Sequence, residues 1–335
     1  MKNTTKCAKL HAVSDLRVEE NVIPSVSEDE VLLEVKACGI CGSDLPRVYT
    51  KGTYHFPTVI GHEFSGRVVC DSENKLTGKK AAVFPLLPCF ECEPCKDGNY
   101  ATCKNYDYYG SRRDGGMTEY IPVKRWNIVE MPETLSFEEG AMCEPVSVGL
   151  HATKKLDISE GDTLLISGAG PIGIIAAQWA TSFGSKAVYF FDIDERKIAF
   201  AKKMGFLEYT GVEKVTCVIE GTGNSAALAR CLEAVEPFGR VVLMGNPSGD
   251  VSMTQNTYWH ILRKELKVFG TWNSSYNDDM NDWRDSIKAL GEGKINVRPL
   301  ITHRYSIDDV NEAFEMMKDR REFYNKVILI MNGGK

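Results

Sequence analysis

The chain of 335 residues has an ordinary composition, with 43% hydrophobic residues, 26% charged residues and a formal net charge of −6. This mildly acidic balance gives no basic footprint for nucleic acid or for an anionic membrane surface. No apolar run approaches the roughly 18 to 20 residues of a membrane span, and the first residues lack the apolar core of a signal peptide. We therefore expect a cytoplasmic protein and, at this length, two domains.

Residues 6–150 have the character of an all-β region built of short strands. Strand-length stretches rich in Val, Ile, Phe and Tyr are separated by Gly, Pro, Asn and Asp, and no long helical period is present. We therefore expect a small barrel-like domain with functional loops. The expected strands are Val31–Ala37, Phe64–Val69, Lys80–Phe84, Met117–Pro122 and Trp126–Val129.

A first group of candidate metal ligands lies within residues 38–66. Cys41 offers a thiolate, His62 an imidazole and Glu63 a carboxylate. Mixed ligands of this kind suit a catalytic zinc, which takes three protein groups and keeps one position open. Taken alone, the pattern favours a buried cysteine and a satisfied histidine. The zinc hypothesis therefore needs a third ligand from elsewhere in the chain.

Four further cysteines follow the spacing C-x2-C-x2-C-x7-C. One loop with this spacing can place four thiolates tetrahedrally around a zinc ion, and such closed sites serve structure rather than chemistry. In the cytoplasm, clustered cysteines indicate metal ligands rather than disulfides. An iron–sulfur cluster is the main rival, but the run lacks the C-x3-C-P ending, which favours zinc. The expected ligands are Cys89, Cys92, Cys95 and Cys103.

Near Leu150 the sequence changes to alternating strands and helices. A strand-like run at 162–167 leads into Gly-Ala-Gly-Pro-Ile-Gly at 168–173, which opens a helical pattern, and a second strand-like run ends in Asp192. This context distinguishes a dinucleotide-binding loop from a chance G-x-G-x-x-G. The glycines allow the tight turn, the approach of the pyrophosphate and close packing of helix on strand.

Asp192 is expected to accept hydrogen bonds from the adenosine ribose and to repel a 2′-phosphate, so NAD is preferred over NADP. The alternative is that Asp192 caps the following helix, for which Asp194 is equally placed. Gly245 follows a later strand and could line the nicotinamide side, or be a plain turn residue. The expected cofactor-binding residues are Gly168, Gly170, Pro171, Ile172, Gly173, Asp192, Arg196 and Gly245.

The alternation of strands and helices continues to about residue 244 and implies a parallel, doubly wound sheet. The run Val327–Ile330 is one more strand, which could return to pair with the first domain. The expected organisation is a catalytic domain with a zinc lobe at 1–150, an NAD-binding domain at 151–285 and a returning segment at 286–335.

With these residues in place, the chain resembles the zinc-dependent medium-chain alcohol dehydrogenases from about Cys7 onward. Four features agree in order and approximate spacing: Gly-Ile-Cys41-Gly-Ser-Asp, Gly61-His62-Glu63, the four-cysteine lobe and the glycine-rich loop. The resemblance implies an α/β plus β architecture, with a GroES-like barrel, a Rossmann domain and a catalytic zinc at the cleft between them. It also implies a homodimer or homotetramer.

The resemblance supplies the missing zinc ligand. Polyol dehydrogenases of the family have a Glu-Pro pair before the Rossmann segment, which matches Glu144-Pro145, whereas Cys143 is one residue out of register. Glu63 is expected to be a metal-binding and catalytic residue. The alternative, which suits it better, is that Glu63 and Asp44 orient His62. The implied ligands of the catalytic zinc are Cys41, His62, Glu63 and Glu144.

The implied reaction is the oxidation of a secondary alcohol with hydride transfer to NAD, and Ser43 serves as the first proton acceptor. Better-known relatives often carry a histidine for the next proton transfer. This chain has Leu45 or Pro46 at that place, so the last proton acceptor is not identified. Similarity within the family is greatest to dehydrogenases of polyol phosphates. The alternatives are a free polyol of the sorbitol or xylitol type, a threonine-like alcohol, or a non-catalytic NAD- or zinc-binding protein.

Two adjacent arginines, Arg112 and Arg113, are the candidate substrate residues. They stand in a glycine-flanked loop directly after the cysteine lobe, and guanidinium groups match phosphate oxygens with paired hydrogen bonds. The alternative is that both form surface salt bridges worth about 0 to 1 kcal/mol. Arg47 and Lys326 are weaker candidates for the same role.

Overall fold

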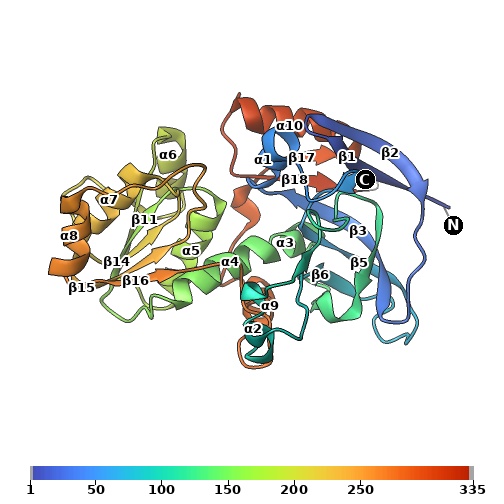
Figure 1. Ribbon diagram of the computed structural model, residues 1–335, viewed down its shortest axis with the longest axis horizontal. Coiled ribbons are helices and arrows are strands. Elements are labelled where there is room, and N and C mark those ends of the chain that lie inside the picture. Colours follow the sequence, from blue (N-terminus) through green and yellow to red (C-terminus); the bar gives the residue numbers. More distant parts are fainter. Residues whose placement is uncertain (1–2, 332–335) are drawn as a thin grey trace. The chain divides into compact units, whose positions relative to one another are not determined.

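The computed structural model describes residues 3–331, and the chain divides into two compact units (Figure 1). One unit takes in the chain up to Glu144 and again from Ser275, and the other runs Pro145–Ser274. Residues 145–150 thus lie with the second unit and residues 275–285 with the first, whereas the boundaries expected from the sequence follow residues 150 and 285. The first unit is therefore assembled from both ends of the chain.

Within residues 3–331, the first unit is built on a mixed sheet of seven strands, in the order β10-β6-β5-β3-β18-β17 with β9 paired to β3. A second sheet has the order β2-β1-β4, and β7 pairs with β8. β18 runs antiparallel to β3, which confirms that the last predicted strand returns to the first domain. The strands are β1 (Thr4–Ala12), β2 (Asp15–Val22), β3 (Glu30–Ile40), β4 (Thr58–Val59), β5 (Glu63–Asp71), β6 (Lys80–Val83), β7 (Leu86–Leu87), β8 (Asp107–Tyr108), β9 (Tyr120–Lys124), β10 (Ile128–Met131), β17 (Ile301–Ser306) and β18 (Lys326–Ile330).

Strand β3 shows how the sequence fixes this sheet. Val31, Leu33, Val35 and Ala37 are buried, and the residues between them are partly exposed. This period of two places one face of the strand on the core. Because β3 pairs with β5, β9 and β18, the buried face becomes the centre of the unit.

Short helices complete the first unit. One buried stripe on α9 consists of Trp283, Ile287 and Leu290, and another on α10 consists of Val310, Phe314 and Met317. The helices are α1 (Asp44–Pro46), which continues as a π-helical turn (Arg47–Lys51), α2 (Glu93–Lys96), α3 (Phe137–Ala141), α9 (Asp282–Gly291) and α10 (Val310–Asp319), with 3₁₀ turns at Tyr100–Thr102, Arg125–Asn127, Arg298–Leu300 and Ile307–Asp309.

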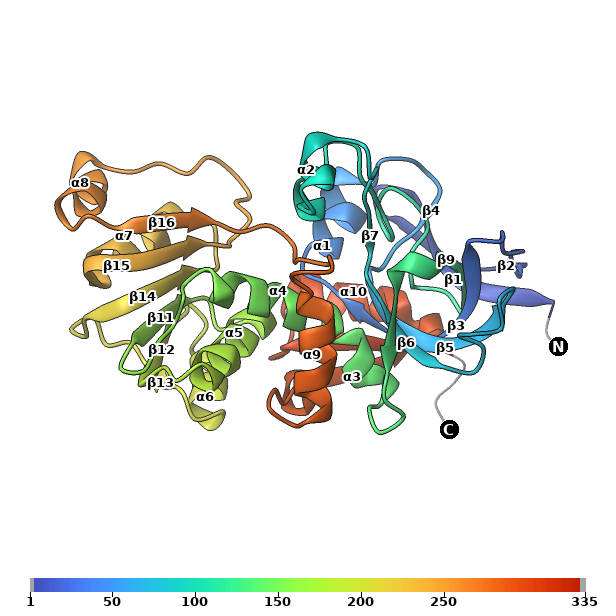
Figure 2. The same cartoon turned by 90° about the horizontal axis from the view of Figure 1, so that it is seen from below.

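The second unit is a parallel sheet of six strands in the order β13-β12-β11-β14-β15-β16. Helices α5 and α6 cover one face and α7 and α8 the other (Figures 1 and 2). The chain reverses its direction across the sheet between β13 and β14, so β11 and β14 flank the switch point where such folds bind ligands. The elements are α4 (Cys143–Lys154), β11 (Thr163–Ser167), α5 (Pro171–Ser182), β12 (Ala187–Phe191), α6 (Glu195–Lys203), β13 (Leu207–Glu208), β14 (Val215–Glu220), α7 (Ser225–Ala234), β15 (Val235–Leu243), α8 (Gln255–Arg263) and β16 (Lys267–Gly270).

Two of the features that were absent from the sequence prediction have a local explanation. The first is the hairpin of β1 and β2. Charged residues occur along both strands and hide the alternation of hydrophobic and polar residues that predicts a strand. Helix α4 contains Pro145 and Gly149, both of which oppose helix formation in a helix interior. Pro145 is tolerated because it lies in the first turn, where its missing N–H has no partner to lose.

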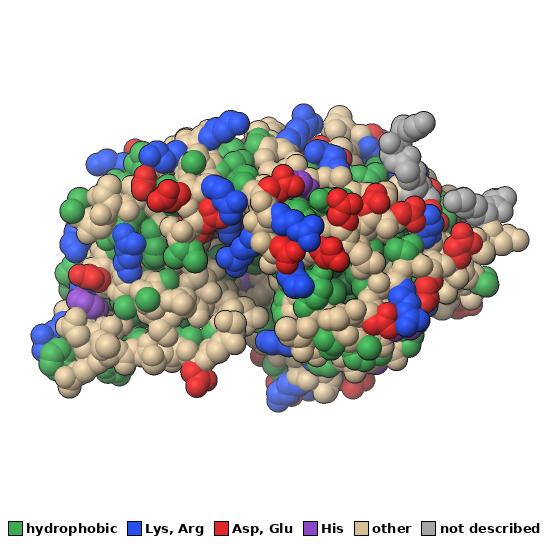
Figure 3. All heavy atoms as spheres, turned by 90° about the horizontal axis from the view of Figure 1, so that it is seen from above, with side chains coloured by type: hydrophobic (Ala, Val, Ile, Leu, Met, Phe, Trp, Pro, Cys, Tyr) green, Lys and Arg blue, Asp and Glu red, His purple; other side chains and the backbone are tan. Residues whose placement is uncertain are grey.

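The surface carries mixed charge. On the face shown in Figure 3, Lys and Arg side chains are interspersed with Asp and Glu, so no large field of one sign forms there. None of the helices within residues 3–331 is long and apolar enough to cross a membrane.

Candidate functional site

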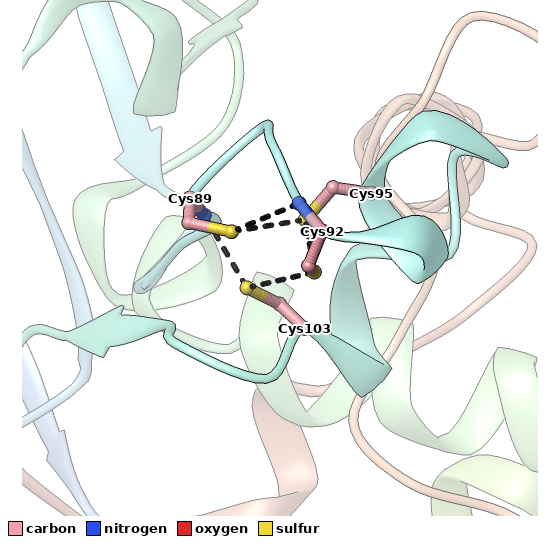
Figure 4. A group of neighbouring side chains, drawn as sticks. All are labelled: Cys89, Cys92, Cys95 and Cys103. Atoms are coloured by element: carbon pink, nitrogen blue, oxygen red, sulfur yellow. Dashed lines mark hydrogen bonds between the residues drawn. The ribbon is translucent and has the colours of Figure 1, made fainter.

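The four cysteines of the lobe converge as the spacing predicts (Figure 4). Cys92 Sγ lies 3.5 Å from Cys95 Sγ and 3.9 Å from Cys103 Sγ, and Cys89 Sγ lies 4.0 Å from Cys95 Sγ. Zn–S bonds of about 2.3 Å in a tetrahedron give S–S separations of about 3.8 Å. The sulfur positions therefore fit a structural zinc.

Backbone N–H groups also point at these sulfurs. The amide of Cys92 donates to Cys89 Sγ at 3.4 Å, and the amides of Cys89 and Asn105 donate to Cys103 Sγ at 3.3 and 3.4 Å. Hydrogen bonds of this kind stabilise thiolates, and those from Lys104 and Cys95 lower the pKa of Cys92 to about 6 despite partial burial. These N–H groups thus favour the thiolate forms of Cys89 and Cys92, whereas burial raises the pKa of Cys95 to about 12.

Cys41, His62 and Glu63 form a second group, in which one ligand atom from each residue lies within 4.8 Å of the others. Cys41 follows the end of β3, and Glu63 begins β5. These strands pair antiparallel with Gly39 opposite Glu63, which brings the two loops together. His62 and Glu63 are buried and Cys41 is half-buried. A thiolate, an imidazole and a carboxylate in one place fit a zinc ion.

Asp44 faces His62 from the loop that carries Cys41. Its Oδ1 lies 3.5 Å from His62 Nδ1, and its Oδ2 accepts the backbone N–H of Cys41 at 3.0 Å. Burial opposes the charge of Asp44, but His62, Arg47 and this N–H lower its pKa to about 2. Burial likewise opposes a charged His62, yet Asp44 and Cys41 raise its pKa well above the usual value. Asp44 is therefore placed to orient the ring.

Glu63 is held by Lys326, which the sequence offers as a weaker candidate for binding phosphate. Lys326 Nζ contacts Glu63 Oε1 and Oε2 at 2.8 and 2.6 Å, and Lys326 is only 4% exposed. The suggestion that Lys326 binds phosphate is wrong, because its ammonium group is buried and committed to Glu63. A Cβ on Gly39 would lie 2.2 Å from Glu63 Oε2, so glycine is needed to admit the carboxylate.

Glu144 lies in the first turn of α4 and is 7% exposed. Burial first, and then the negative charges of Glu63 and Asp44, raise the pKa of Glu144 to about 7 against the influence of His62. Charges of the Cys41 group thus influence Glu144. Glu144 is not among the residues whose ligand atoms all lie within 4.8 Å of one another. Its role as a zinc ligand stays a prediction. The neighbouring Cys143 donates its S–H to the carbonyl of Trp283 at 3.9 Å.

Two site features escaped the sequence analysis. The Tyr108 ring lies 5.8 Å from that of His62, and burial raises the pKa of Tyr108. Arg47 Nη1 donates to Ser43 Oγ at 2.9 Å and to Asp44 Oδ1 at 2.8 Å. If the helical turn at 44–51 had been expected, the spacing of four residues would have indicated the contact between Ser43 and Arg47.

The adjacent arginines Arg112 and Arg113 have different surroundings. The Arg112 guanidinium lies 4.0 Å from the ring centre of Tyr54 and 4.4 Å from that of Tyr106. Its Nε is buried without a hydrogen-bond partner. Arg113 Nε instead pairs with Asp107 at 3.5 Å, and its guanidinium lies 5.1 Å from the ring centre of Tyr109.

In the second unit, the glycine-rich loop follows β11 and opens α5. Gly168 has φ +96°, a conformation that favours glycine. A Cβ on Gly173 would lie 2.2 Å from the carbonyl oxygen of Gly168, which explains the close approach of helix and strand. A Cβ on Gly170 would meet nothing within 4 Å, so space is open beside this backbone. Pro171 and Ile172 form the first turn of α5.

Asp192 binds the glycine-rich loop rather than capping a helix. Its Oδ2 accepts the N–H of Ala169 at 2.9 Å, and its Oδ1 accepts that of Asp194 at 2.9 Å. Asp194 is the cap of α6, and it pairs with Arg196 at 2.8 and 2.9 Å. The capping alternative for Asp192 is therefore wrong. A Cβ on Gly245 would lie 2.0 Å from the nitrogen of Gly223, so Gly245 is packed on the loop after β14.

The comparisons with known proteins agree with both units. The model of the alcohol dehydrogenase GroES-like domain matches residues 27–133, and that of the zinc-binding dehydrogenases matches residues 171–292. Galactitol 1-phosphate 5-dehydrogenase of Escherichia coli K12 is 36% identical over 94% of this chain and 96% of its own. Sorbitol dehydrogenase of Bacillus subtilis is 29% identical over 97% and 96%.

Solved structures show the same architecture. The crystal structure of galactitol-1-phosphate dehydrogenase from Escherichia coli has a TM-score of 0.91 and 35% identity over 97% of this chain and 99% of its own. An alcohol dehydrogenase of Escherichia coli CFT073, solved with NADH, has a TM-score of 0.89 and 28% identity over 98% and 100%. The chain belongs to the zinc-binding dehydrogenases of the alcohol dehydrogenase family, which are oxidoreductases that act on alcohols.

Proposed function

We propose that the protein oxidises a secondary alcohol of a polyol phosphate to a ketose phosphate and transfers the hydride to NAD. The observation that carries the choice of a phosphorylated substrate is the free guanidinium of Arg112. Among residues 3–331, no carboxylate pairs with it, and its buried Nε has no partner. The extensive identity to a galactitol 1-phosphate dehydrogenase supports the same substrate class.

The stack of Tyr54, Arg112 and Tyr106 is suited to an anion. Two aromatic faces hold the guanidinium plane, which leaves its N–H edge to bind phosphate oxygens in pairs. The ring centres of Tyr106 and Tyr108 lie 6.3 Å apart, and those of Tyr108 and His62 lie 5.8 Å apart. Neighbouring rings thus connect the proposed phosphate ligand with the proposed metal ligands.

At the reacting carbon, the protein residues bind the alcohol and move its proton. Zinc held by Cys41, His62 and Glu144 would polarise the alcohol oxygen as a Lewis acid. Ser43 takes up the hydroxyl proton, and the hydrogen on carbon leaves with its electron pair for the nicotinamide. The products are a ketone, NADH and one proton. Asp44, whose Oδ1 lies 3.5 Å from His62 Nδ1, is placed to orient the His62 ring.

The proposed cofactor is NAD rather than NADP. The Asp192 carboxylate is fixed by two backbone N–H groups beside the glycine-rich loop, where a ribose would lie in this fold. Its charge disfavours a 2′-phosphate at that position. A cytoplasmic location and a homodimeric or homotetrameric state remain part of the proposal.

The proposal is tested with matched pairs of polyols, with and without phosphate, followed by NADH absorbance. Arg112→Ala should lower kcat/KM for the phosphorylated substrate about 10- to 100-fold more than for the free polyol, because charge-assisted hydrogen bonds are lost. Arg113→Ala is the matched control, because Arg113 is already paired with Asp107. Parallel losses on both substrates would instead favour a free-polyol dehydrogenase, a function consistent with the likeness to sorbitol dehydrogenase.

A further inference from the structure

Arg47 connects two groups of the candidate active site. Its Nη1 lies 2.9 Å from Ser43 Oγ and 2.8 Å from Asp44 Oδ1, so one donor nitrogen serves both oxygens. Asp44 is fully buried and Arg47 keeps 22% of its side chain exposed. The helical turn at 44–51 produces this geometry, because it places Arg47 one turn beyond Ser43.

The contact restricts what the Ser43 hydroxyl can do. Guanidinium groups only donate hydrogen bonds, so Ser43 Oγ must accept from Arg47. A hydroxyl oxygen has two lone pairs and one hydrogen. With one lone pair held by Arg47, the other is left to receive the proton of the alcohol, and the hydrogen is left to be passed on. The oxygen is thereby oriented for a relay.

Arg47 also compensates the charge of Asp44. That carboxylate accepts the Cys41 amide and faces His62, so it supports two proposed metal ligands at once. Removing Arg47 would leave a buried carboxylate without its guanidinium, which is costly in a protein interior. The loop that positions Cys41 would then shift or admit water.

We propose that Arg47 is a positioning residue that orients Ser43 for proton transfer and holds Asp44 in place behind His62. This role rests on the proposed function only in that an alcohol is oxidised; it does not depend on a phosphate. It also differs from the sequence expectation, in which Arg47 was a weak candidate for binding phosphate.

Arg47→Met is compared with Arg125→Met as a matched control. Arg125 is 21% exposed and pairs with Asp71, which is fully buried, so both substitutions remove a guanidinium from a buried carboxylate. Arg47→Met should lower kcat about 10- to 100-fold with the KM for NAD unchanged, since proton relays contribute about 10²- to 10⁴-fold. Arg125→Met should leave kcat within about twofold. Arg47→Lys keeps the positive charge and should recover part of the loss. The recovery should be incomplete, because one ammonium cannot reproduce the guanidinium fork.

A second measurement needs no substrate. Zinc release to a chelator is followed in cofactor-free protein, together with the visible spectrum after cobalt substitution. Arg47→Met should release one zinc equivalent several-fold faster than wild type and Arg125→Met, and should alter the cobalt spectrum. Unchanged release and an unchanged spectrum would overturn the role of Arg47 behind His62.

A double-mutant cycle tests the link to Ser43. If Arg47 acts through Ser43, adding Arg47→Met to Ser43→Ala should reduce kcat little further. Fully additive losses, or a loss confined to phosphorylated substrates, would overturn the proposal. Failure of the polyol phosphate assignment can be distinguished from failure of the role proposed for Arg47. In the first case free polyols would be the better substrates, and Arg47→Met would still lower kcat on them. Should Arg47→Met fail to fold, Arg47→Lys is used in the same cycle.

Discussion

Lys326 and Glu63 form a buried ion pair although they lie 263 positions apart in the chain. Both carboxylate oxygens of Glu63 contact Lys326 Nζ, and the side chains are 1% and 5% exposed. The desolvation of each charge is thus compensated by the other. Because Glu63 directly follows His62, the pair fixes the backbone that carries a proposed zinc ligand.

Lys326→Met should therefore destabilise the first unit strongly. Removing one partner of a buried pair costs about 3 to 5 kcal/mol, because the remaining charge is left uncompensated. Chemical denaturation measures the loss. Lys75→Met is the control, since its pair with Glu73 is exposed to solvent and screened, so its loss should change stability little. Similar losses in both variants would contradict the structural importance of the buried pair.

Zinc removal should occur in two stages. The four-cysteine site is closed, whereas the Cys41 site is expected to keep one position open. Mild chelation should remove about one equivalent per chain and abolish activity while the far-UV spectrum persists. Zinc content, activity and circular dichroism are followed together. Activity that disappears only on global unfolding would contradict this order.

Asp192→Ala should weaken NAD binding and raise the relative use of NADP, because the charge opposed to a 2′-phosphate is removed. The ratio of kcat/KM values for the two cofactors measures the change. Asp194→Ala is the matched control. It removes the cap of α6 and should cost about 0.5 to 2 kcal/mol of stability without altering cofactor choice. A wild-type enzyme that already prefers NADP would refute the assignment.

Glu144→Ala should reduce activity far more than Cys143→Ala. The first change removes a proposed metal ligand, whereas the second removes a buried thiol bonded to the Trp283 carbonyl. Steady-state rates and zinc content are measured for both variants. Equal losses would show that the Glu-Pro register had been misassigned.

Asp162 should make stability depend on pH in the acid range. Burial opposes its charge, but Ser159, Thr216 and Arg240 outweigh burial and lower its pKa to about 2. A depressed carboxyl pKa stabilises the fold above the unfolded value of about 3.9, and the contribution is lost as pH falls toward 2. Asp162→Asn should therefore cost about 2 kcal/mol at pH 7 and progressively less below pH 4. Unfolding free energies at several pH values test this, and a pH-independent loss would contradict it.

Local patterns were sufficient to predict part of the site. The cysteine lobe and the glycine-rich loop are each contained in fewer than twenty residues, so spacing alone indicates which groups meet. Lys326 could not be matched with Glu63, because their contact depends on β18 pairing with β3. The different surroundings of Arg112 and Arg113 were equally hidden, since Tyr54 comes from a distant loop. Long-range pairing carries no periodic signal.

The division of the chain has a consequence for its synthesis. The second unit is continuous, but the first lacks β18 and β17 in its main sheet until almost the whole chain has been translated. Proteins usually fold domain by domain as they leave the ribosome, with the N-terminal domain first. Here the second unit can fold before the first is complete, because residues 145–274 are continuous whereas the nascent strand β3 still waits for β18. A chain truncated before residue 326 would leave β3 without β18 and Glu63 without the lysine that neutralises it.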